Sequence, residues 1–302
     1  MRLIHIPSLT LMEFDCGIPS YAILSHTWRG NNGDREVTFA GFQKVAAELI
    51  EAHPYSDKLL GACQVALTLQ LEYLWVDTCC IDKTKSAELS EAINSMFSWY
   101  ESARICIVYL DDYVSGDKKF IDVDAFRHCR WFKRVWTLQE LLAPQTVYFY
   151  DKHWVYLGDK FHLGALLSYI TRIETDFLEK RVPIQTASVA KRMSWAAGRQ
   201  STREEDKAYS LLGIFNVNMP LLYGERSKSF IRLQEEILKE IDDHSIFAWK
   251  EIRGVFATSP DDFADSGNIT SFPQAKAKKG NSRTCSQLFR SWHLPYCDLS
   301  AS

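Results

Sequence analysis

The chain has 302 residues, of which 46% are hydrophobic and 24% are charged, values typical of a soluble globular protein that buries a full core. Its 35 basic and 38 acidic residues give a formal charge of -3, so there is no global basic field of the kind that attracts nucleic acid or anionic lipid. We therefore expect neither a nucleic-acid partner nor a membrane partner.

Two features of the sequence indicate a reducing compartment. The apolar N-terminal stretch is interrupted by His5, Pro7 and Glu13 before a signal-peptide core can form, and no apolar run approaches the length of a membrane span. The eight cysteines are scattered without a C-x-x-C pair, which argues against a zinc ribbon and against a secreted disulfide framework. We therefore expect a cytoplasmic protein.

The first part of the chain predicts strands that alternate with helices, because short apolar runs alternate with longer stretches of helical period. In chain order, the predicted elements are two short strands in 2–14, a buried strand in 21–28, helices at 40–52 and 57–71, a core strand at 73–77, a helix that begins at Ser86, and a core strand at 104–110.

The pattern changes after the helix that carries Glu140. A fourth strand is predicted at 146–150, and it can pair with residues 153–157 as a hairpin. Beyond that point the predicted elements are helices at 160–171, 184–197, 204–213 and 226–241. After residue 258 the chain is rich in Ser, Gly, Pro and Lys, a composition typical of poor order.

This order of elements predicts the fold class and the domains. Strands that are apolar nearly throughout and separated by helices indicate a mainly parallel sheet with helices on both faces. The fold class is therefore α/β with an added C-terminal helical lobe. We expect an α/β domain at 1–157, a helical lobe packed on it at 158–257, and a poorly ordered tail at 258–302.

In an open parallel sheet, ligands bind where the carboxyl ends of the strands and their loops gather. This rule selects the loops "SHTWRG", "DTCCID" and "DD" that follow the core strands, together with the helix that carries Glu140. We expect Ser25 or His26, Asp77 and Glu140 to gather at one edge of the sheet. The whole candidate set is Ser25, His26, Trp28, Asp77, Cys79, Cys80, Asp82 and Glu140.

Most of these residues have a structural interpretation beside the chemical one. His26 with Ser25 fits acid–base catalysis, but a Ser-His pair at a strand end is more often turn chemistry. Cys79 or Cys80 beside His26 fits a thiol nucleophile or simple burial. Asp77 and Asp82 with His26 fit a metal site or the turn and cap residues of a strand-to-helix loop, and we predict no metal.

Glu140 has two interpretations of the same kind. Thr137 to Glu140 reads T-x-x-E, a capping box in which both side chains satisfy free backbone N–H groups of the first helical turn. Alternatively, a carboxylate near Trp136 lies at the rim of a pocket whose aromatic wall holds a flat ligand. A capping glutamate can also expose one carboxylate oxygen to a pocket.

Three long blocks of the sequence resemble the fungal heterokaryon incompatibility (HET) domain. They are "YAILSHTWRG" with "EVTF", then "LEYLWVDTCCIDKTKSAELSEAINSMFSWYESARICIVYLDD", then "WFKRVWTLQELLAP". Downstream, "RMSWAAGRQSTREEDKAYSLLGIFNVNMPLLYGE" resembles the segment that follows this domain in many fungal proteins. The resemblance covers about residues 1 to 250.

The resemblance implies a cytosolic module of fungal non-self recognition whose activation triggers growth arrest or death of fused cells. It also implies a distant relation to TIR domains, a flavodoxin-like α/β fold that includes enzymes cleaving NAD with a helical glutamate. That glutamate lies in a pattern resembling W-C-x-x-E. Here "WTLQE" places Trp136 and Glu140 at the same spacing, with Thr137 instead of cysteine. The resemblance thus implies Glu140 as the catalytic residue of an NAD glycohydrolase without cofactor or metal.

The chemistry of such a reaction suits one carboxylate. Breaking the nicotinamide–ribose bond passes through an oxocarbenium-like ribose that a glutamate stabilises, while tryptophan stacks on a flat ring and arginine contacts the pyrophosphate. The predicted substrate-binding residues are Ser25, His26, Trp28, Arg29, Asp77, Arg134 and Trp136.

A non-enzymatic role is the alternative. In that case the same fold is a death or signalling adaptor that acts by self-association and recruitment of partners. The sequence contains no P-loop motif and no repeat period that would mark a sensor domain. The chain is then a stand-alone effector, a fragment of a longer protein, or the partner of a separate sensor protein.

Overall fold

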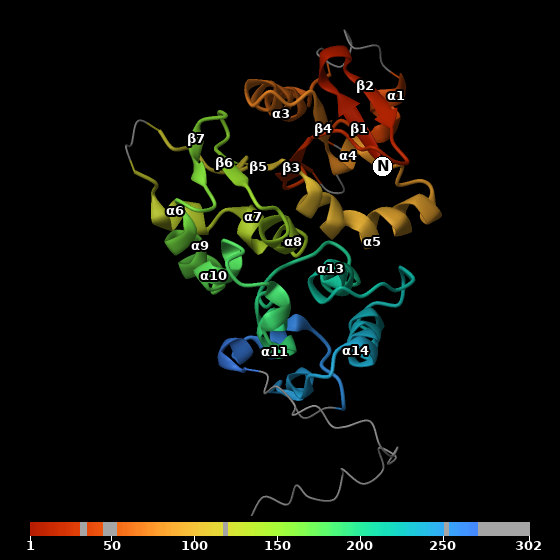
Figure 1. Ribbon diagram of the computed structural model, residues 1–302, viewed down its shortest axis with the longest axis vertical. Helices are drawn as coiled ribbons and strands as arrows, with labels where there is room; N and C mark the ends of the chain where they lie inside the picture. The colour runs from red at the N-terminus through yellow and green to blue at the C-terminus, as the bar shows by residue number, and fades with distance from the viewer. Residues whose placement is uncertain (31–34, 45–52, 117–119, 251–253, 271–302) are drawn as a thin grey trace, which may run out of the picture. The chain divides into compact units, whose positions relative to one another are not determined.

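Seven strands form one sheet at the centre of the computed structural model, which describes residues 1–30, 35–44, 53–116, 120–250 and 254–270 (Figure 1). The sheet has the order β2-β1-β4-β3-β5-β6-β7. Its strands are β1 (Arg2–His5), β2 (Thr10–Glu13), β3 (Ala22–His26), β4 (Tyr73–Trp75), β5 (Ile105–Tyr109), β6 (Val147–Tyr150) and β7 (Tyr156–Asp159).

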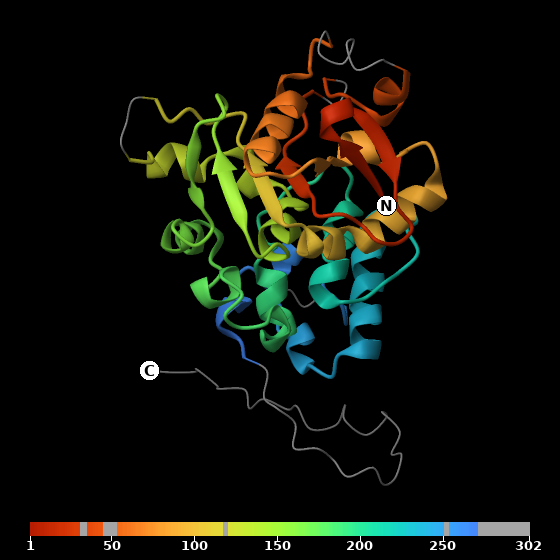
Figure 2. The ribbon, with the colours of Figure 1, turned by 45° about the horizontal axis from the view of Figure 1, so that its top comes forward.

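The four central strands β4, β3, β5 and β6 are parallel, and the two edges are antiparallel. Figure 2 shows the red hairpin of β1 and β2 at one edge and the green hairpin of β6 and β7 at the other. All residues of β3 and β5 are buried, as expected for strands covered on both faces. The prediction of an α/β fold with a mostly parallel central sheet is confirmed.

The four parallel strands lie side by side in the order β4, β3, β5, β6. Numbered by their order in the chain, this is second, first, third, fourth. The chain therefore leaves β3 in one direction to reach β4 and returns across β3 to reach β5. In doubly wound sheets the loops on either side of such a reversal leave a crevice at the carboxyl ends of the strands. The position of the reversal is next to His26, the last residue of β3.

The helices between these strands cover the sheet, with α3 above it and α5 beneath it in Figure 1. Helix α5 begins at Ser86, as predicted, and its Ile93, Met96 and Tyr100 are buried. The loop "DTCCID" contains a short helix that the sequence did not predict. The helices are α1 (Phe39–Lys44), α3 (Asp57–Thr68), α4 (Asp77–Cys80) and α5 (Ser86–Ser102).

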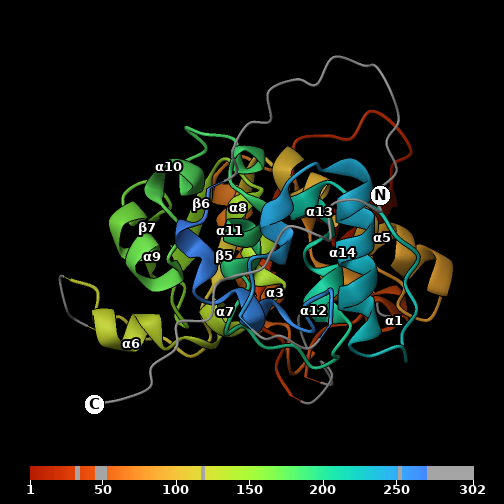
Figure 3. The same ribbon diagram turned by 90° about the horizontal axis from the view of Figure 1, so that it is seen from below.

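The chain after β5 adds mostly short helices, several of which pack beneath the sheet (Figure 3). They are α6 (Val123–Arg127), α7 (Arg130–Lys133), α8 (Thr137–Leu142), α9 (Gly164–Thr171), α10 (Thr175–Leu178), α11 (Val189–Ser194), α12 (Asp206–Tyr209), α13 (Leu212–Phe215) and α14 (Lys228–Glu240). Helix α13 packs on α5. Residues 1–271 form one compact unit, and a domain boundary near 157 stays a prediction.

The region after residue 258 differs from the prediction where the structure describes it. Two 3-10 helices lie at Pro260–Phe263 and Ser266–Asn268, and both contact α11. Ser259 and Asp262 form a capping box at the first of them, which explains local order in a polar segment. Residues 271–302 lie outside the described residues. Among the described helices, none is long and apolar enough to cross a membrane.

Candidate active site

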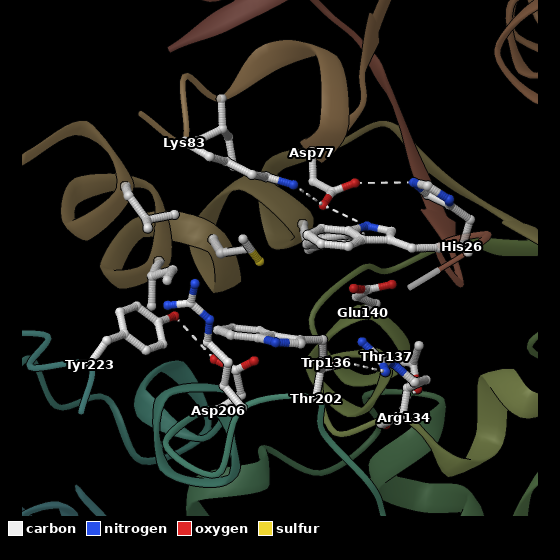
Figure 4. Close-up of a pocket in the computed structure, with 18 residues that line it drawn as sticks. His26, Asp77, Lys83, Arg134, Trp136, Thr137, Glu140, Thr202, Asp206 and Tyr223 are labelled. Carbon is white, nitrogen blue, oxygen red and sulfur yellow. Dashed lines mark hydrogen bonds and ion pairs between the residues drawn. The ribbon is translucent and has the colours of Figure 1, made fainter. Parts of the chain in front are cut away.

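A cavity of about 480 Å³ opens at the carboxyl ends of β3 and β4 (Figure 4). This volume falls within the usual range of small-molecule sites. Its walls come from the loops after β3 and β4, from one side of α5, from the segment that carries α8, and from residues 202–223. The charged residues that line it are Asp77, Lys83, Arg134, Glu140, Arg203 and Asp206.

Glu140 reaches this cavity from the short helix α8, whose six residues are all buried. Its carboxyl group accepts a hydrogen bond from the hydroxyl of Ser25, which is completely buried behind it. The indole Nε1 of Trp131 donates to the same hydroxyl oxygen at 2.8 Å, so the Ser25 proton is directed at Glu140. The end of β3 therefore fixes the position of the Glu140 side chain.

Burial raises the pKa of Glu140 to about 8, and the negative charge of Asp77 acts in the same direction. The hydrogen bond from Ser25 and the charge of Arg134 oppose this shift without cancelling it. At neutral pH, most molecules therefore carry a protonated Glu140. A carboxyl group with a pKa near the working pH is suited to proton transfer.

The capping-box interpretation of Thr137 and Glu140 is wrong. Trp136 occupies the N-cap position with helical dihedral angles, and no side chain accepts a hydrogen bond from a backbone N–H group there. The Thr137 hydroxyl instead lies 2.5 Å from the carbonyl oxygen of Trp131 and 2.9 Å from that of Arg134. Because the helix begins directly after another helical residue, its first turn has no extended cap position for a threonine to occupy.

Basic residues from later in the chain hold both ends of α8. At its start, the guanidinium of Arg199 donates to the Thr137 hydroxyl and to the Arg134 carbonyl, each at 3.1 Å. At its end, the ammonium of Lys160 donates to the carbonyls of Leu141 and Pro144 at 3.2 and 2.5 Å. Burial lowers the pKa of Lys160 to about 7. Cations at the carboxyl end of a helix satisfy its free carbonyl groups and complement its dipole.

Asp77, the first residue of α4, receives three hydrogen bonds at the other side of the cavity. His26 Nε2 contacts one carboxylate oxygen at 3.0 Å, while Trp28 Nε1 and Lys83 Nζ contact the other at 3.0 and 3.3 Å. Burial alone would raise the pKa of Asp77, but the charge of Lys83 and the hydrogen bond from His26 outweigh it, and the pKa falls well below its usual range. Asp77 is therefore a permanent anion.

A buried lysine stands behind His26. Lys58 Nζ lies 3.0 Å from His26 Nδ1 and 3.0 Å from the Thr27 carbonyl oxygen, and it forms an ion pair with Glu36. When Lys58 carries its proton, Nδ1 of His26 must accept, so Nε2 carries the ring proton and donates to Asp77. Lys58 thus sets the tautomer in which His26 supports the Asp77 carboxylate.

Two tryptophans, Trp28 and Trp136, line the cavity together with the carboxyl groups. The Lys83 ammonium lies 3.6 Å from the centroid of the Trp28 ring, and Trp136 lines the wall formed by the α8 segment. Figure 4 shows Trp136 between Tyr223 and Glu140. Half-buried indole rings that line a cavity are suited to stacking on a flat ring.

The far wall carries a second polar group. Tyr223 donates to Asp206 at 3.0 Å, and the Arg203 guanidinium lies 4.4 Å from the centroid of the Tyr223 ring. Arg134 donates to the hydroxyl of Thr202 at 3.3 Å. Among the described residues, neither of these arginines forms an ion pair with a carboxylate, so both guanidinium groups keep capacity for an anion.

The structure gathers most of the residues that the sequence nominated. Ser25 lies behind the cavity and contacts it only through Glu140. Arg29 does not line the cavity either, because its guanidinium makes two hydrogen bonds to Asp57 at 2.7 and 2.9 Å. The nominated residues that line the cavity are His26, Trp28, Asp77, Arg134, Trp136 and Glu140.

The thiol and metal interpretations gain no support. Cys79 Sγ donates to the Val37 carbonyl oxygen at 3.1 Å and does not line the cavity, and burial raises its pKa well above the usual value. Burial also raises the pKa of the Cys80 thiol to about 12. In the part of the chain that the structure describes, no group of three His, Cys, Asp or Glu side chains has the geometry to hold a metal ion.

Sequence reasoning missed the residues that complete the cavity from other elements. All but Lys83, which directly follows the loop "DTCCID", lie away from the carboxyl ends of the predicted core strands, so the strand-end rule does not select them. Four of them lie in residues 192–225, the block that resembles the segment downstream of the HET domain in fungal proteins. That resemblance was the signal that could have identified them. The missed polar residues are Lys83, Tyr100, Thr202, Arg203, Asp206 and Tyr223.

Comparisons with known proteins agree on one family. Residues 21–128 match the family model described as heterokaryon incompatibility protein (HET), and residues 228–278 match a domain of unknown function (DUF8212). The chain is 44% identical over 229 residues to the vegetative incompatibility protein HET-E-1 of Podospora anserina, which covers 74% of this chain and 16% of that protein. No solved structure matches the chain significantly. Glu140 lies within neither of the two family matches.

Proposed function

The chain is a heterokaryon incompatibility (HET) domain protein, and we propose that it is an effector of fungal non-self recognition that triggers death of fused cells. The family match and the name of the similar protein support this role. The chain spans 16% of that relative, so its partners and trigger belong to the proposal as well. The effector acts in the cytoplasm, on a signal from a separate sensor or from self-association.

The proposed chemistry is hydrolysis of NAD at the nicotinamide–ribose bond. The observation that carries it is the position of Glu140: a buried carboxyl group, held by Ser25, that lines a cavity of nucleotide-binding size together with two tryptophans. A buried carboxyl group that serves only the fold has no reason to face a cavity, and its desolvation costs stability.

The sheet supports a relation to TIR domains. Its parallel strands have the second, first, third, fourth order of flavodoxin-like folds, in which ligands bind beside the reversal at the carboxyl ends of the strands. The cavity lies at that place, between the loops after β3 and β4. Trp136 and Glu140 have the spacing of the TIR glutamate motif and both line it.

In this reaction the bond between C1′ of the ribose and the nicotinamide nitrogen breaks, and its electron pair leaves with nicotinamide. The pyridinium ring is already cationic, so the leaving group needs no proton. The Glu140 carboxylate stabilises the positive charge that develops on the ribose. Water then adds to C1′ and loses a proton, which gives ADP-ribose.

The surrounding residues bind the substrate. Trp28 and Trp136 stack on its flat rings, and Arg134 contacts the pyrophosphate. Arg29 is not assigned to this role, because its pairing with Asp57 directs it away from the cavity.

Nicotinamide release from NAD by the purified protein tests this chemistry. Wild type and Glu91→Gln, a change at an exposed glutamate of α5, should release nicotinamide and ADP-ribose at equal rates, while Glu140→Gln should be at least about a hundredfold slower. Equal rates for Glu140→Gln and wild type would refute the assignment.

A non-enzymatic adaptor is the second candidate. Phe161 and Tyr169 are each 66% exposed near α9, and exposed aromatic rings of this kind mark contact surfaces. The adaptor would act through self-association and partner recruitment at such a surface. Under this hypothesis Glu140→Gln keeps its toxicity, whereas Phe161→Ser with Tyr169→Ser loses it.

A further inference from the structure

The segment that matches the domain of unknown function packs against the elements around the cavity. Where the structure describes it, at 228–250 and 254–270, it consists of α14 and the 3-10 helices η3 (His244–Phe247), η4 (Pro260–Phe263) and η5 (Ser266–Asn268). Helix α14 packs on α12, and all three 3-10 helices contact α11 (Figures 1 and 3). This part of the segment belongs to the same compact unit as the HET match.

The segment satisfies free backbone N–H groups at the start of α11. The carboxylate of Asp243 accepts a hydrogen bond from Val189 N at 2.8 Å, and the hydroxyl of Ser245 accepts one from Ala190 N at 3.0 Å. The first N–H groups of a helix have no partner within the helix, and six residues make a helix too short to be stable alone. Helix α11 therefore depends on these two side chains.

Helix η4 contacts the chain again just after α11. One carboxylate oxygen of Asp261 accepts a hydrogen bond from Gly198 N at 2.6 Å, and the other accepts one from Lys207 Nζ at 3.1 Å. Lys207 belongs to α12, whose first residue is Asp206 of the cavity wall. A single carboxylate thus holds two segments that lead to the cavity.

The contacts that hold the start of α8 follow Gly198 directly. Arg199, the next residue, donates a hydrogen bond to the hydroxyl of Thr137, the first residue of α8. The carbonyl oxygen of Gln200 accepts a backbone hydrogen bond from Val135 N at 3.0 Å. The position of the chain at 198–200 therefore influences the position of α8.

Helix η4 is a rigid base for this carboxylate. Pro260 and Phe263 are buried, and the side-chain amide of Gln234 on α14 makes hydrogen bonds of 2.8 and 3.0 Å with the backbone of Ala257. Close-packed apolar residues transmit displacement and do not absorb it. Asp261 is thus fixed from α11 and α14 before it contacts 198–207.

We propose that the segment matching the domain of unknown function is a brace for the candidate site, with Asp261 as its positioning residue. Asp261 holds the chain at 198–200, and with it the start of α8, while its ion pair with Lys207 holds the far wall. Asp261 does not line the cavity, so it acts only through these residues. The brace goes beyond the proposed chemistry, because it concerns how α8 is held for any reaction at the site.

Hydrogen exchange of the full chain, measured by mass spectrometry, tests the brace without a substrate. Asp261→Ala removes both contacts, so peptides covering 133–143 should take up deuterium at least about fivefold faster than in wild type. Peptides from β5 should exchange as in wild type, because the change is local. Asp265→Ala is the matched control: its carboxylate lies in the same segment and pairs there with Lys250, so uptake at 133–143 should not change.

A conservative variant checks that the hydrogen bond to Gly198 is responsible. Asp261→Asn keeps an oxygen that can accept from Gly198 N but loses the charge that pairs with Lys207. Its exchange at 133–143 should stay within about twofold of wild type. Exchange as fast as in Asp261→Ala would overturn the hydrogen bond as the link to α8.

The nicotinamide assay supplies a second readout, which rests on the proposed function. Because the rate depends on the placement of the helix that carries Glu140, Asp261→Ala should lower kcat at least about fivefold, and Asp265→Ala should leave it unchanged. Faster exchange at 133–143 with an unchanged kcat would overturn the role of Asp261 in positioning the site.

The outcomes keep the brace and the proposed function apart. Wild-type exchange at 133–143 in Asp261→Ala overturns the brace, and so does an equal acceleration in β5, which would show a general loss of stability. If wild type releases no nicotinamide, the proposed chemistry fails, and the exchange measurement alone decides the brace.

Discussion

Glu140 makes the stability of the protein depend on pH. Its pKa is about 8 in the folded protein and near its ordinary value when unfolded, so between about pH 4.5 and 8 only the folded state keeps the proton. The free energy of unfolding therefore falls as pH rises through this window, by on the order of 5 kcal/mol for this one group. Glu140→Gln should remove that contribution.

Urea unfolding of wild type and Glu140→Gln at pH 5, 7 and 9 measures the effect. The free energy of unfolding of Glu140→Gln, relative to that of wild type, should rise with each increase in pH. Parallel curves across the three pH values would show that Glu140 is not buried in an apolar setting.

Thr137 contributes to stability through buried polar contacts and not through a helix cap. Thr137→Ala removes a hydroxyl that contacts two carbonyl oxygens and accepts from Arg199, so unfolding should become easier by about 1–3 kcal/mol. Thr137→Ser keeps the hydroxyl and should recover most of that loss in a thermal melt. Equal losses in the two variants would assign the effect to the methyl group.

At the scale of single residues, the strand-end rule located Ser25, His26 and Asp77 without any structural information, because parallel strands end at a common edge. It could not show that Arg29 turns away, since the competing partner Asp57 lies 28 residues further along the chain. The sequence could not predict the raised pKa of Glu140 either, because that pKa depends on burial by elements that come together only in the fold.

At the scale of elements, the sequence predicted those with strong periodic or apolar patterns. The strands β3 and β5 and the helices α5 and α14 are of this kind. The four-residue helices α4, α7, α10, α12 and α13 were missed or merged into longer ones, because one turn contains too few residues to show a 3.6-residue period. Tertiary contacts form such helices, and those contacts are not local.

The close packing of α13 on α5 is one of these tertiary contacts, and it can be tested. A Cβ atom on Gly213 would lie 2.0 Å from Cβ of Phe97, so Gly213→Ala should force the helices apart and destabilise the protein by more than about 2 kcal/mol. Gly41→Ala in α1 is the matched control, since its nearest contact would be an ordinary 3.4 Å to Thr38. Chemical denaturation should show little change in the control, and similar losses in both would contradict the packing argument.

At the scale of the whole molecule, the chain beyond the HET match completes the cavity. Gln200 forms a parallel bridge with Arg134, and Lys160 and Arg199 hold the two ends of α8. Arg203, Asp206 and Tyr223 form the far wall. The candidate site therefore depends on residues that the sequence pattern assigned to a separate lobe.

A fragment of residues 1–157 should consequently not reach the folded structure that the longer chain forms. It would lose Arg199 and Lys160 and expose the buried residues of α8 to water. Circular dichroism melts of fragments 1–157 and 1–270 compare them directly: the longer one should unfold cooperatively and the shorter one should not. A cooperative transition in both would support an independent α/β domain.

The central claim is that Glu140 acts on NAD to cause cell death, and one measurement in fungal cells tests it most directly. NAD content and growth are followed together after induced expression of wild type, Glu91→Gln and Glu140→Gln at matched protein levels. The account predicts that NAD falls before growth stops with wild type and Glu91→Gln, and that Glu140→Gln leaves both unchanged. Growth arrest by Glu140→Gln at normal NAD content would contradict the enzymatic account and favour the adaptor.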